Sequence, residues 1–202
     1  MIGLIPMPEP TQPSSPLHLP PMELAAWLAE RWHEGTRQPE SVYRLPVLVT
    51  SGIKPEGRTI VIRQVTEDPL QLQIHTDTRS PKVRQLTDSP ACLLVWYDPV
   101  ARLQIQARGT TSLHIGDARA REVWEQLPEH NGRQYGQVEP PGSELIAPGH
   151  HVLPEKEDGW PHFCLVSVTI EEIEMLQLHR DGNTRCRLLR SPAGWRKVWI
   201  AP

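Results

Sequence analysis

The sequence predicts a mainly β domain with flanking helices. Short β-branched or alternating segments recur between residues 44 and 114 and return at residue 162. Helical patterns are few, and the sequence contains no internal repeat. Strands at short intervals with few helices indicate an antiparallel barrel or sandwich.

Three segments have helical patterns. In "PMELAAWLAERWHEG", residues 21–35, Leu24, Trp27 and Leu28 share one stripe, and Gly35 closes the helix. The other two helices are expected over 80–90 and 116–130.

Six segments have strand patterns, and a terminal hairpin follows them. In "LQLQIHT" apolar and polar residues alternate, which is the period of a half-buried strand. In "TIEEIEM", 169–175, the acidic residues are expected on the solvent face of a strand. The long segment 132–161 has no periodicity, which is typical of a functional or disordered loop. The expected strands cover 44–52, 58–65, 70–76, 91–98, 102–114 and 162–178, and the hairpin lies within 184–202.

The totals exclude several functional classes. The chain has 202 residues, a net charge of −3 and a pI near 6.3, so general attraction to nucleic acid or anionic membranes has no support. No apolar run is long enough for a membrane span, and the start of the chain does not resemble a signal peptide. Three widely spaced cysteines match no zinc or disulfide framework, which indicates a reducing, cytoplasmic location. Residues 1–21 are rich in proline and are expected to form an extended or disordered arm.

The stretch "HTDTRSPKVRQL", residues 75–86, has two interpretations. Ser80 suits a helix N-cap and Pro81 the first helical position, so the stretch can simply be a capped helix. The start of a helix also attracts anions, and Arg79, Lys82 and the hydroxyl of Thr76 would complete a phosphate site.

A second cue comes from "GRTIVIRQV". Arg58 and Arg63 stand at the two ends of an apolar strand pattern. They can be plain edge charges, or guanidinium groups that reach a phosphate.

Four segments in this order, "GRTIVIRQV", "LQIHTDTRSPKVRQLTDSPACLLVW", "RLQIQARGT" and "GWRKVWIAP", resemble the pyridoxamine 5′-phosphate oxidase family. The segment "PEHNGRQYGQVEPPGSEL" is more similar to the wider oxidase-related group of FMN-binding split barrels. The resemblance covers residues 22–202. It implies a six-stranded antiparallel split β-barrel of Greek-key type, and a homodimer with FMN at its interface.

The resemblance also implies a set of flavin-binding residues. The strand from Arg58 to Arg63 would lie along the flavin, and Arg58, Thr76 and Lys82 would grip the phosphate. Gln104 would meet the isoalloxazine ring, and Arg185 falls where the family has a late flavin-contacting arginine. The full expected set is Arg58, Thr59, Ile60, Val61, Arg63, His75, Thr76, Arg79, Ser80, Lys82, Gln104 and Arg185.

The sequence departs from the oxidases at three places. Pro81 replaces an arginine before the lysine, and Arg79 is the candidate substitute. Leu176 replaces a tryptophan near the flavin. The late Arg-x-His pair that grips pyridoxal phosphate corresponds to Asp181-Gly182-Asn183, where an aspartate would repel a phosphorylated substrate.

The expected function is therefore an FMN-dependent oxidoreductase for an unidentified small molecule. The flavin supplies the redox chemistry, no catalytic residue is assigned, and Arg63 is the expected substrate-side charge. A non-enzymatic flavin-binding or sensing protein of the same fold is an alternative. A haem-handling split barrel is another, with His150, His151 and His179 as available ligands. No metal site is expected, because the adjacent His150 and His151 would point apart.

Overall fold

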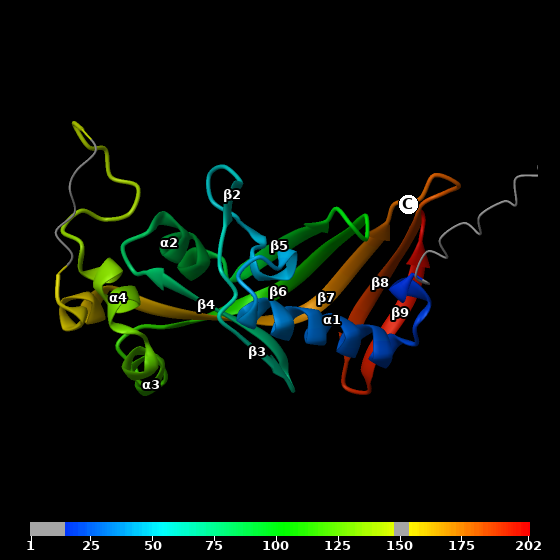
Figure 1. Ribbon diagram of the computed structural model, residues 1–202, viewed down its shortest axis with the longest axis horizontal. Helices are drawn as coiled ribbons and strands as arrows, with labels where there is room; N and C mark the ends of the chain where they lie inside the picture. The colour runs from blue at the N-terminus through cyan, green and yellow to red at the C-terminus, as the bar shows by residue number, and fades with distance from the viewer. Residues whose placement is uncertain (1–14, 148–153) are drawn as a thin grey trace, which may run out of the picture.

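The computed structural model describes residues 15–147 and 154–202 (Figure 1). Most of the expected arm, residues 1–14, and the histidines at 150 and 151 lie outside these ranges. Within them the chain forms nine strands instead of the expected six, joined in one antiparallel sheet. The strands are β1 Val47–Thr50, β2 Glu56–Thr59, β3 Gln64–Glu67, β4 Leu70–Asp77, β5 Ala91–Asp98, β6 Leu103–His114, β7 Phe163–Gln177, β8 Thr184–Ser191 and β9 Gly194–Ile200.

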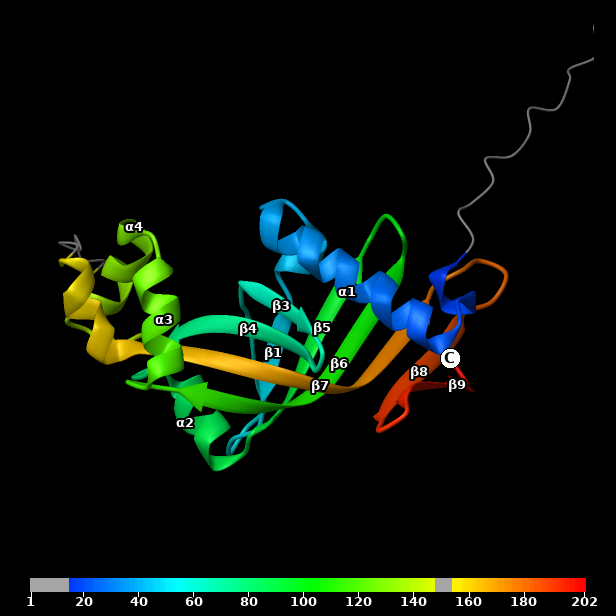
Figure 2. The same cartoon turned by 90° about the horizontal axis from the view of Figure 1, so that it is seen from below.

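Four α-helices and four 3-10 helices accompany the strands in the described ranges. The α-helices are α1 Pro21–Arg37, α2 Pro81–Asp88, α3 Ala118–Gln126 and α4 Glu129–Gly132. The 3-10 helices are η1 Pro16–His18, η2 Val42–Arg44, η3 Arg133–Gly136 and η4 Lys156–His162. Figure 2 shows α1 and α2 on opposite sides of the sheet. No helix in the described ranges is both long and apolar enough to span a membrane.

The strand β7 organises the sheet. Strand β6 pairs with nearly the whole of one edge of β7. The other edge pairs first with β4 and then with β8. From β6 the sheet continues through β5 and β1 to β2, and from β4 it continues to β3. In Figure 1, β7 consequently runs along the long axis of the molecule, with α2 towards one end and β8 towards the other.

The expected single strand over 58–65 is wrong. Residues 56–59 pair with β1, whereas 64–67 pair with β4. Between them, Ile62 is fully buried, and the backbone N–H of Arg63 donates to the carbonyl of Gln73. The apolar run therefore crosses from one part of the sheet to another instead of keeping one partner.

The part of the expected arm that the structure describes packs on the domain. Leu17 is fully buried, and Lys197 in β9 donates to the carbonyls of Leu17 and Leu19 at 2.9 and 2.6 Å. Helix α1 follows directly and buries Leu24, Leu28 and Trp32. Leu24 and Leu28 belong to the predicted stripe, and Trp32 does not.

The segment expected to be irregular contains a small second core. Trp124 of α3 packs against Phe163 at the start of β7, with ring centroids 5.1 Å apart. Tyr135 and Trp160 complete this aromatic cluster. Helices α4, η3 and η4 are too short to give a recognisable period, which explains why the sequence pattern missed them.

We expect Gly109→Ala to destabilise the fold by about 3 kcal/mol. Gly109 lies at a bulge between β6 and β7, where a Cβ would meet the carbonyl oxygen of Thr169 at 2.1 Å. Gly52→Ala is the control, since the nearest atom to its added methyl would be in the flexible side chain of Gln85, at 3.3 Å. Urea unfolding measures both variants. A Gly109→Ala protein as stable as the wild type would show that the two strands can separate freely at the bulge.

Candidate functional site

Helix α2 begins at Pro81, as predicted, and its first turn gathers hydroxyl and ammonium groups. Ser80 is buried, and its hydroxyl donates to the carbonyl of Asp77 at 2.7 Å instead of capping the helix. The Oγ1 of Thr76 accepts from the ammonium of Lys82 at 3.0 Å and lies 3.3 Å from the Ser80 hydroxyl. Three of the predicted phosphate ligands are therefore together.

Arg58 lies on the neighbouring part of the sheet and is anchored by two residues that the sequence analysis missed. Its guanidinium donates to the hydroxyl of Thr50 and, at 3.3 Å, to the side-chain oxygen of Gln85. It also pairs with Glu56 at 2.9 Å. Gln85 stands three residues after Lys82 and hence on the same helix face, a spacing that could have indicated its role.

The two cations of this cluster act on each other. Burial lowers the pKa of Lys82, and the positive charge of Arg58 lowers it further. In the described parts of the chain Lys82 has no carboxylate partner within ion-pair distance. A half-buried ammonium that has no carboxylate partner of its own and feels the charge of a guanidinium is a site that an anion would stabilise. The set formed by the donors of Arg58, Thr76 and Lys82, with Ser80 beside them, fits a phosphate. We call it the phosphate half-site.

Arg79 has a different environment. Its guanidinium forms a two-pronged pair with Asp77, with N–O distances of 3.1 and 2.7 Å. It also donates to the carbonyls of Tyr135, Gln137 and Val138. Arg79 therefore ties the loop after η3 to β4, and the structure does not bring its guanidinium to Lys82.

The remaining residues of this region divide between surface and interior. Thr59 and Arg63 are exposed, whereas Ile60 and Val61 are partly buried. His75 packs edge-on against Phe163 at 5.2 Å. Burial, with a smaller contribution from the charge of Arg63, lowers the pKa of His75 from 6.5 to about 4. His75 is thus neutral at physiological pH.

The lowered pKa of His75 predicts acid sensitivity. In the unfolded chain the imidazole would take up a proton as the pH falls through 6.5, whereas in the fold it stays neutral down to about 4. Stability from this residue is complete above the unfolded pKa and is lost as the pH falls towards the folded pKa. We expect a loss of about 2 kcal/mol between about pH 8 and about pH 5, and a flatter profile in His75→Gln. Parallel profiles from urea unfolding would show that His75 takes up its proton equally in both states.

The two remaining predicted flavin residues, Gln104 and Arg185, lie in one row across the sheet. Tyr97 of β5 pairs with Gln104 of β6, Gln104 with Leu176 of β7, and Leu176 with Arg185 of β8. Residues paired in register share a face of the sheet, so these four side chains lie on one face. We call them the ring half-site.

A buried carboxylate beside this row corrects the expectation for the acidic strand. The Glu174 side chain is only 2% exposed, so it is not on a solvent face. It accepts hydrogen bonds from Arg185 and Arg187 of β8. Burial raises the pKa of Glu174, but its two arginine partners outweigh burial and hold the pKa below its usual value. The two arginines stand 11 and 13 residues later, on the next strand, and cannot be read from the local pattern.

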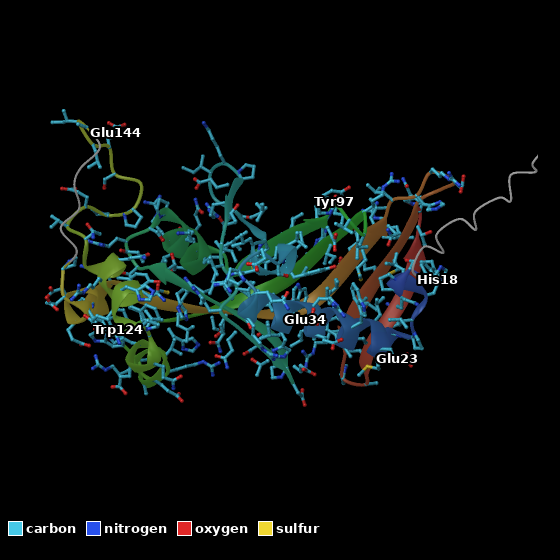
Figure 3. All side chains as sticks on the ribbon, viewed as in Figure 1. His18, Glu23, Glu34, Tyr97, Trp124 and Glu144 are labelled. Carbon is cyan, nitrogen blue, oxygen red and sulfur yellow. The ribbon has the colours of Figure 1, made fainter. Side chains whose placement is uncertain are left out.

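The two half-sites lie far apart within one chain. Thr76 pairs with Cys164 near the start of β7, whereas Arg185 pairs with Leu176 near its end. Twelve residues of strand correspond to about 40 Å, well beyond the reach of one FMN molecule. Figure 3 shows Tyr97, of the ring half-site, far from Trp124, which packs at the start of β7. The sheet therefore separates the predicted residues into two groups.

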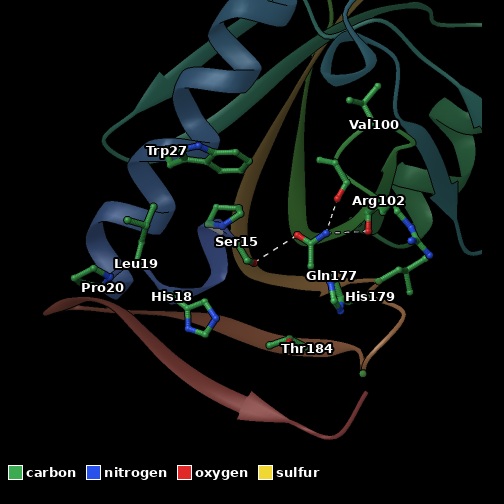
Figure 4. A pocket seen from close by; sticks show the side chains of 14 residues that line it. Ser15, His18, Leu19, Pro20, Trp27, Val100, Arg102, Gln177, His179 and Thr184 are labelled. Atoms are coloured by element: carbon green, nitrogen blue, oxygen red, sulfur yellow. Dashed lines mark hydrogen bonds between the residues drawn. The ribbon is translucent and has the colours of Figure 1, made fainter. Parts of the chain in front are cut away.

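A cavity of about 780 Å³ lies elsewhere (Figure 4). Its walls come from the segment before α1, Trp27, the turn between β5 and β6, and the loop between β7 and β8. None of the predicted flavin residues lines it. We place the functional site at the half-sites, because they contain the predicted flavin residues and because Lys82 has no carboxylate partner in the described parts of the chain. In the loop beside this cavity, His179 lies 3.5 Å from Asp181.

Comparison with known proteins shows which family part of the chain is similar to. Residues 22–115 match the family described as pyridoxamine 5′-phosphate oxidase, FMN-binding domain. This segment is similar to that family. The match confirms FMN as the cofactor of the FMN-binding domain, and it includes the phosphate half-site and Gln104 but not Arg185. A search of the curated proteins finds no match.

Solved structures extend the likeness beyond the matched segment. The FMN-binding domain is similar to a pyridoxamine 5′-phosphate oxidase-related, FMN-binding protein from Nostoc punctiforme PCC 73102, at 26% identity over 88% of this chain and 96% of that one, with a TM-score of 0.71. PhzG from Burkholderia lata 383 shares the fold at 16% identity, with 95% and 98% covered and a TM-score of 0.72. The predicted class, a mainly β split barrel with flanking helices, is thereby confirmed.

Proposed function

We propose that this protein is an FMN-dependent oxidoreductase that works as a homodimer on a small-molecule substrate. The observation that carries the proposal is the phosphate half-site. There the charge of Arg58 acts on Lys82, which has no carboxylate partner in the described residues, within the segment that matches the family. We also propose a cytoplasmic location. The cysteines are free and buried, and no helix in the described residues is long and apolar enough to span a membrane.

The chain's own groups account for cofactor binding. The guanidinium of Arg58 offers N–H donors, Lys82 a point charge and the hydroxyl of Thr76 a neutral donor. The Ser80 hydroxyl already donates to the carbonyl of Asp77 and therefore supports the turn beside them. Thr50 and Gln85 hold Arg58 in place. Bound FMN supplies the electron transfer, and the protein supplies position and charge.

A homodimer follows from the separation of the half-sites. One FMN molecule cannot touch Lys82 and Arg185 of the same chain if β7 holds them about 40 Å apart. A two-fold dimer would bring the phosphate half-site of one copy to the ring half-site of its partner and form two equal sites. This arrangement uses every part of residues 22–202, which we propose as one functional domain.

The proposed substrate carries no phosphate. Asp181 and Asn183 replace the pair that grips a phosphorylated substrate in the oxidases, and Asp181 is exposed in the loop after β7. Arg63, an exposed cation beside the neutral His75, is the proposed contact for an anionic or polar group of the substrate.

Anaerobic titration of the FMN-loaded protein tests the catalytic part. Candidate amines and reduced aromatic compounds, with and without phosphate groups, are added, and loss of the visible absorbance of oxidised flavin is recorded. We expect bleaching by an unphosphorylated compound, slowed in Arg63→Ala. If FMN binds tightly but no compound bleaches it, the second candidate, a non-enzymatic flavin-binding protein, is favoured. The loss of the oxidases' substrate-gripping pair supports that candidate.

A further inference from the structure

Glu174 is placed where it can fix the direction of Arg185. The Nε and Nη2 groups of Arg185 both donate to the same carboxylate oxygen of Glu174, Nε at 3.0 Å. The second carboxylate oxygen accepts from Arg187 at 3.0 Å. In the parts of the chain that the structure describes, the Nη1 group of Arg185 has no hydrogen-bond partner.

The surroundings of Glu174 keep the carboxylate charged and in place. Its side chain is 2% exposed, against 30% for Arg185 and 37% for Arg187. A carboxylate withdrawn from water stays ionised only with such partners. Since both of its oxygens are occupied, Glu174 cannot rotate without losing an arginine. The edge of the Arg185 guanidinium that carries Nε and Nη2 is therefore fixed against Glu174, and its free donors remain available on the face of the ring half-site.

The charges of the cluster do not cancel. Arg108, Arg185 and Arg187 contribute three positive charges, and Glu172 and Glu174 contribute two negative ones, which leaves one positive charge. Glu172 contacts Arg108 and Arg187 but not Arg185. Glu174 alone therefore connects the cluster to the predicted flavin-contacting arginine.

We propose that Glu174 is a positioning residue for the flavin: it aims Arg185 at the isoalloxazine ring and sets the net charge beside it. This inference rests on the proposed function, because it needs the flavin ring at the ring half-site. Replacing Glu174 would have two consequences, which differ in origin. Loss of direction weakens FMN binding, whereas loss of the negative charge makes the environment of the ring more positive. A more positive environment favours the form of the flavin that has taken up electrons.

A double-mutant cycle between Glu174→Gln and Arg185→Ala tests the first consequence. Full-length protein is titrated with FMN, and quenching of flavin fluorescence gives the Kd. We expect each single variant to raise the Kd about tenfold, and the double variant to be no worse than Arg185→Ala alone. The control is Glu172→Gln, which removes a carboxylate from the same cluster and should leave the Kd unchanged. Additive effects of the two substitutions, or an equal loss in Glu172→Gln, would overturn the proposal.

The midpoint potential of bound FMN tests the second consequence. We expect a more positive potential in FMN-loaded Glu174→Gln and a smaller shift in Glu172→Gln, because Glu172 lies further along β7 from the partner of Arg185. A merely structural role for Glu174 would leave the potential unchanged, and that result overturns the inference. If Glu174→Gln does not fold, Glu174→Asp carries the same expectation for affinity, because it withdraws the carboxylate by one methylene. If Arg185→Ala binds FMN like the wild type while Lys82→Ala does not, only this inference fails. If the wild type binds no FMN, the proposed function fails.

Discussion

Replacing Arg58 and Lys82 together by alanine is expected to raise the Kd for FMN by about a thousandfold. Each side chain supplies charge-assisted donors to the phosphate, and each is worth about 1.5–3 kcal/mol in such a role. The pair is also the reason why the site attracts an anion, since burial and the charge of Arg58 lower the pKa of Lys82. Spectra of the purified variant with added FMN, after removal of unbound cofactor, measure the loss.

The matched control is Arg84→Ala, which removes an exposed cation from the same helix. Unfolding of both variants without FMN separates loss of the site from loss of the fold. The double variant should be at least as stable as the wild type without cofactor, because it relieves the repulsion between two cations. Retention of FMN by a folded Arg58→Ala/Lys82→Ala protein would place the flavin phosphate elsewhere.

Mixing two defective proteins is expected to restore FMN binding. Arg58→Ala/Lys82→Ala lacks the phosphate half-site, and Gln104→Ala/Arg185→Ala lacks the ring half-site. In a heterodimer of the two, one of the two sites receives both intact halves, because each site takes one half from each copy. Co-expression with two different affinity tags isolates the heterodimer, which should bind one FMN per two chains at a concentration where neither parent homodimer retains any.

Failure of this heterodimer to bind FMN would show that both halves of a site come from one chain. A tagged wild-type dimer, prepared in the same way and loaded with two FMN molecules, shows that the tags do not interfere. The heterodimer tests whether one site is shared between two chains. The parent variants, measured alone, test which residues form the site.

Much of the fold could be predicted because local pattern and tertiary role agree. The alternation in residues 70–76 and the apolar run of 91–98 became β4 and β5, and Ser80-Pro81 marked the start of α2. The run at 58–65 failed because its residues change partner strands midway, and no local pattern records which strand a residue pairs with. The count of six strands came from the family resemblance, and the structure divides the same chain into nine.

The site could be predicted only where its chemistry is local. Thr76, Ser80 and Lys82 stand within seven residues, and the fold brings them together as expected. Arg79 has the right charge at nearly the right place, but Asp77, two residues earlier, engages it. Thr50 and Glu174 depend on partners more than seven residues away in the chain, and nothing near them in the sequence points to those partners.

The length of β7 has a consequence for how this protein can change over time. The strand carries the partner of Thr76 near one end and the partner of Arg185 near the other, so its length sets the distance between the half-sites. Inserting a single residue between them would turn every later side chain to the opposite face of the sheet. Inserting two residues would keep each side chain on its face but would lengthen the strand between the half-sites by about 7 Å. The half-sites of the two copies would then no longer meet. Insertions and deletions should therefore be confined to the loops at the two ends of β7.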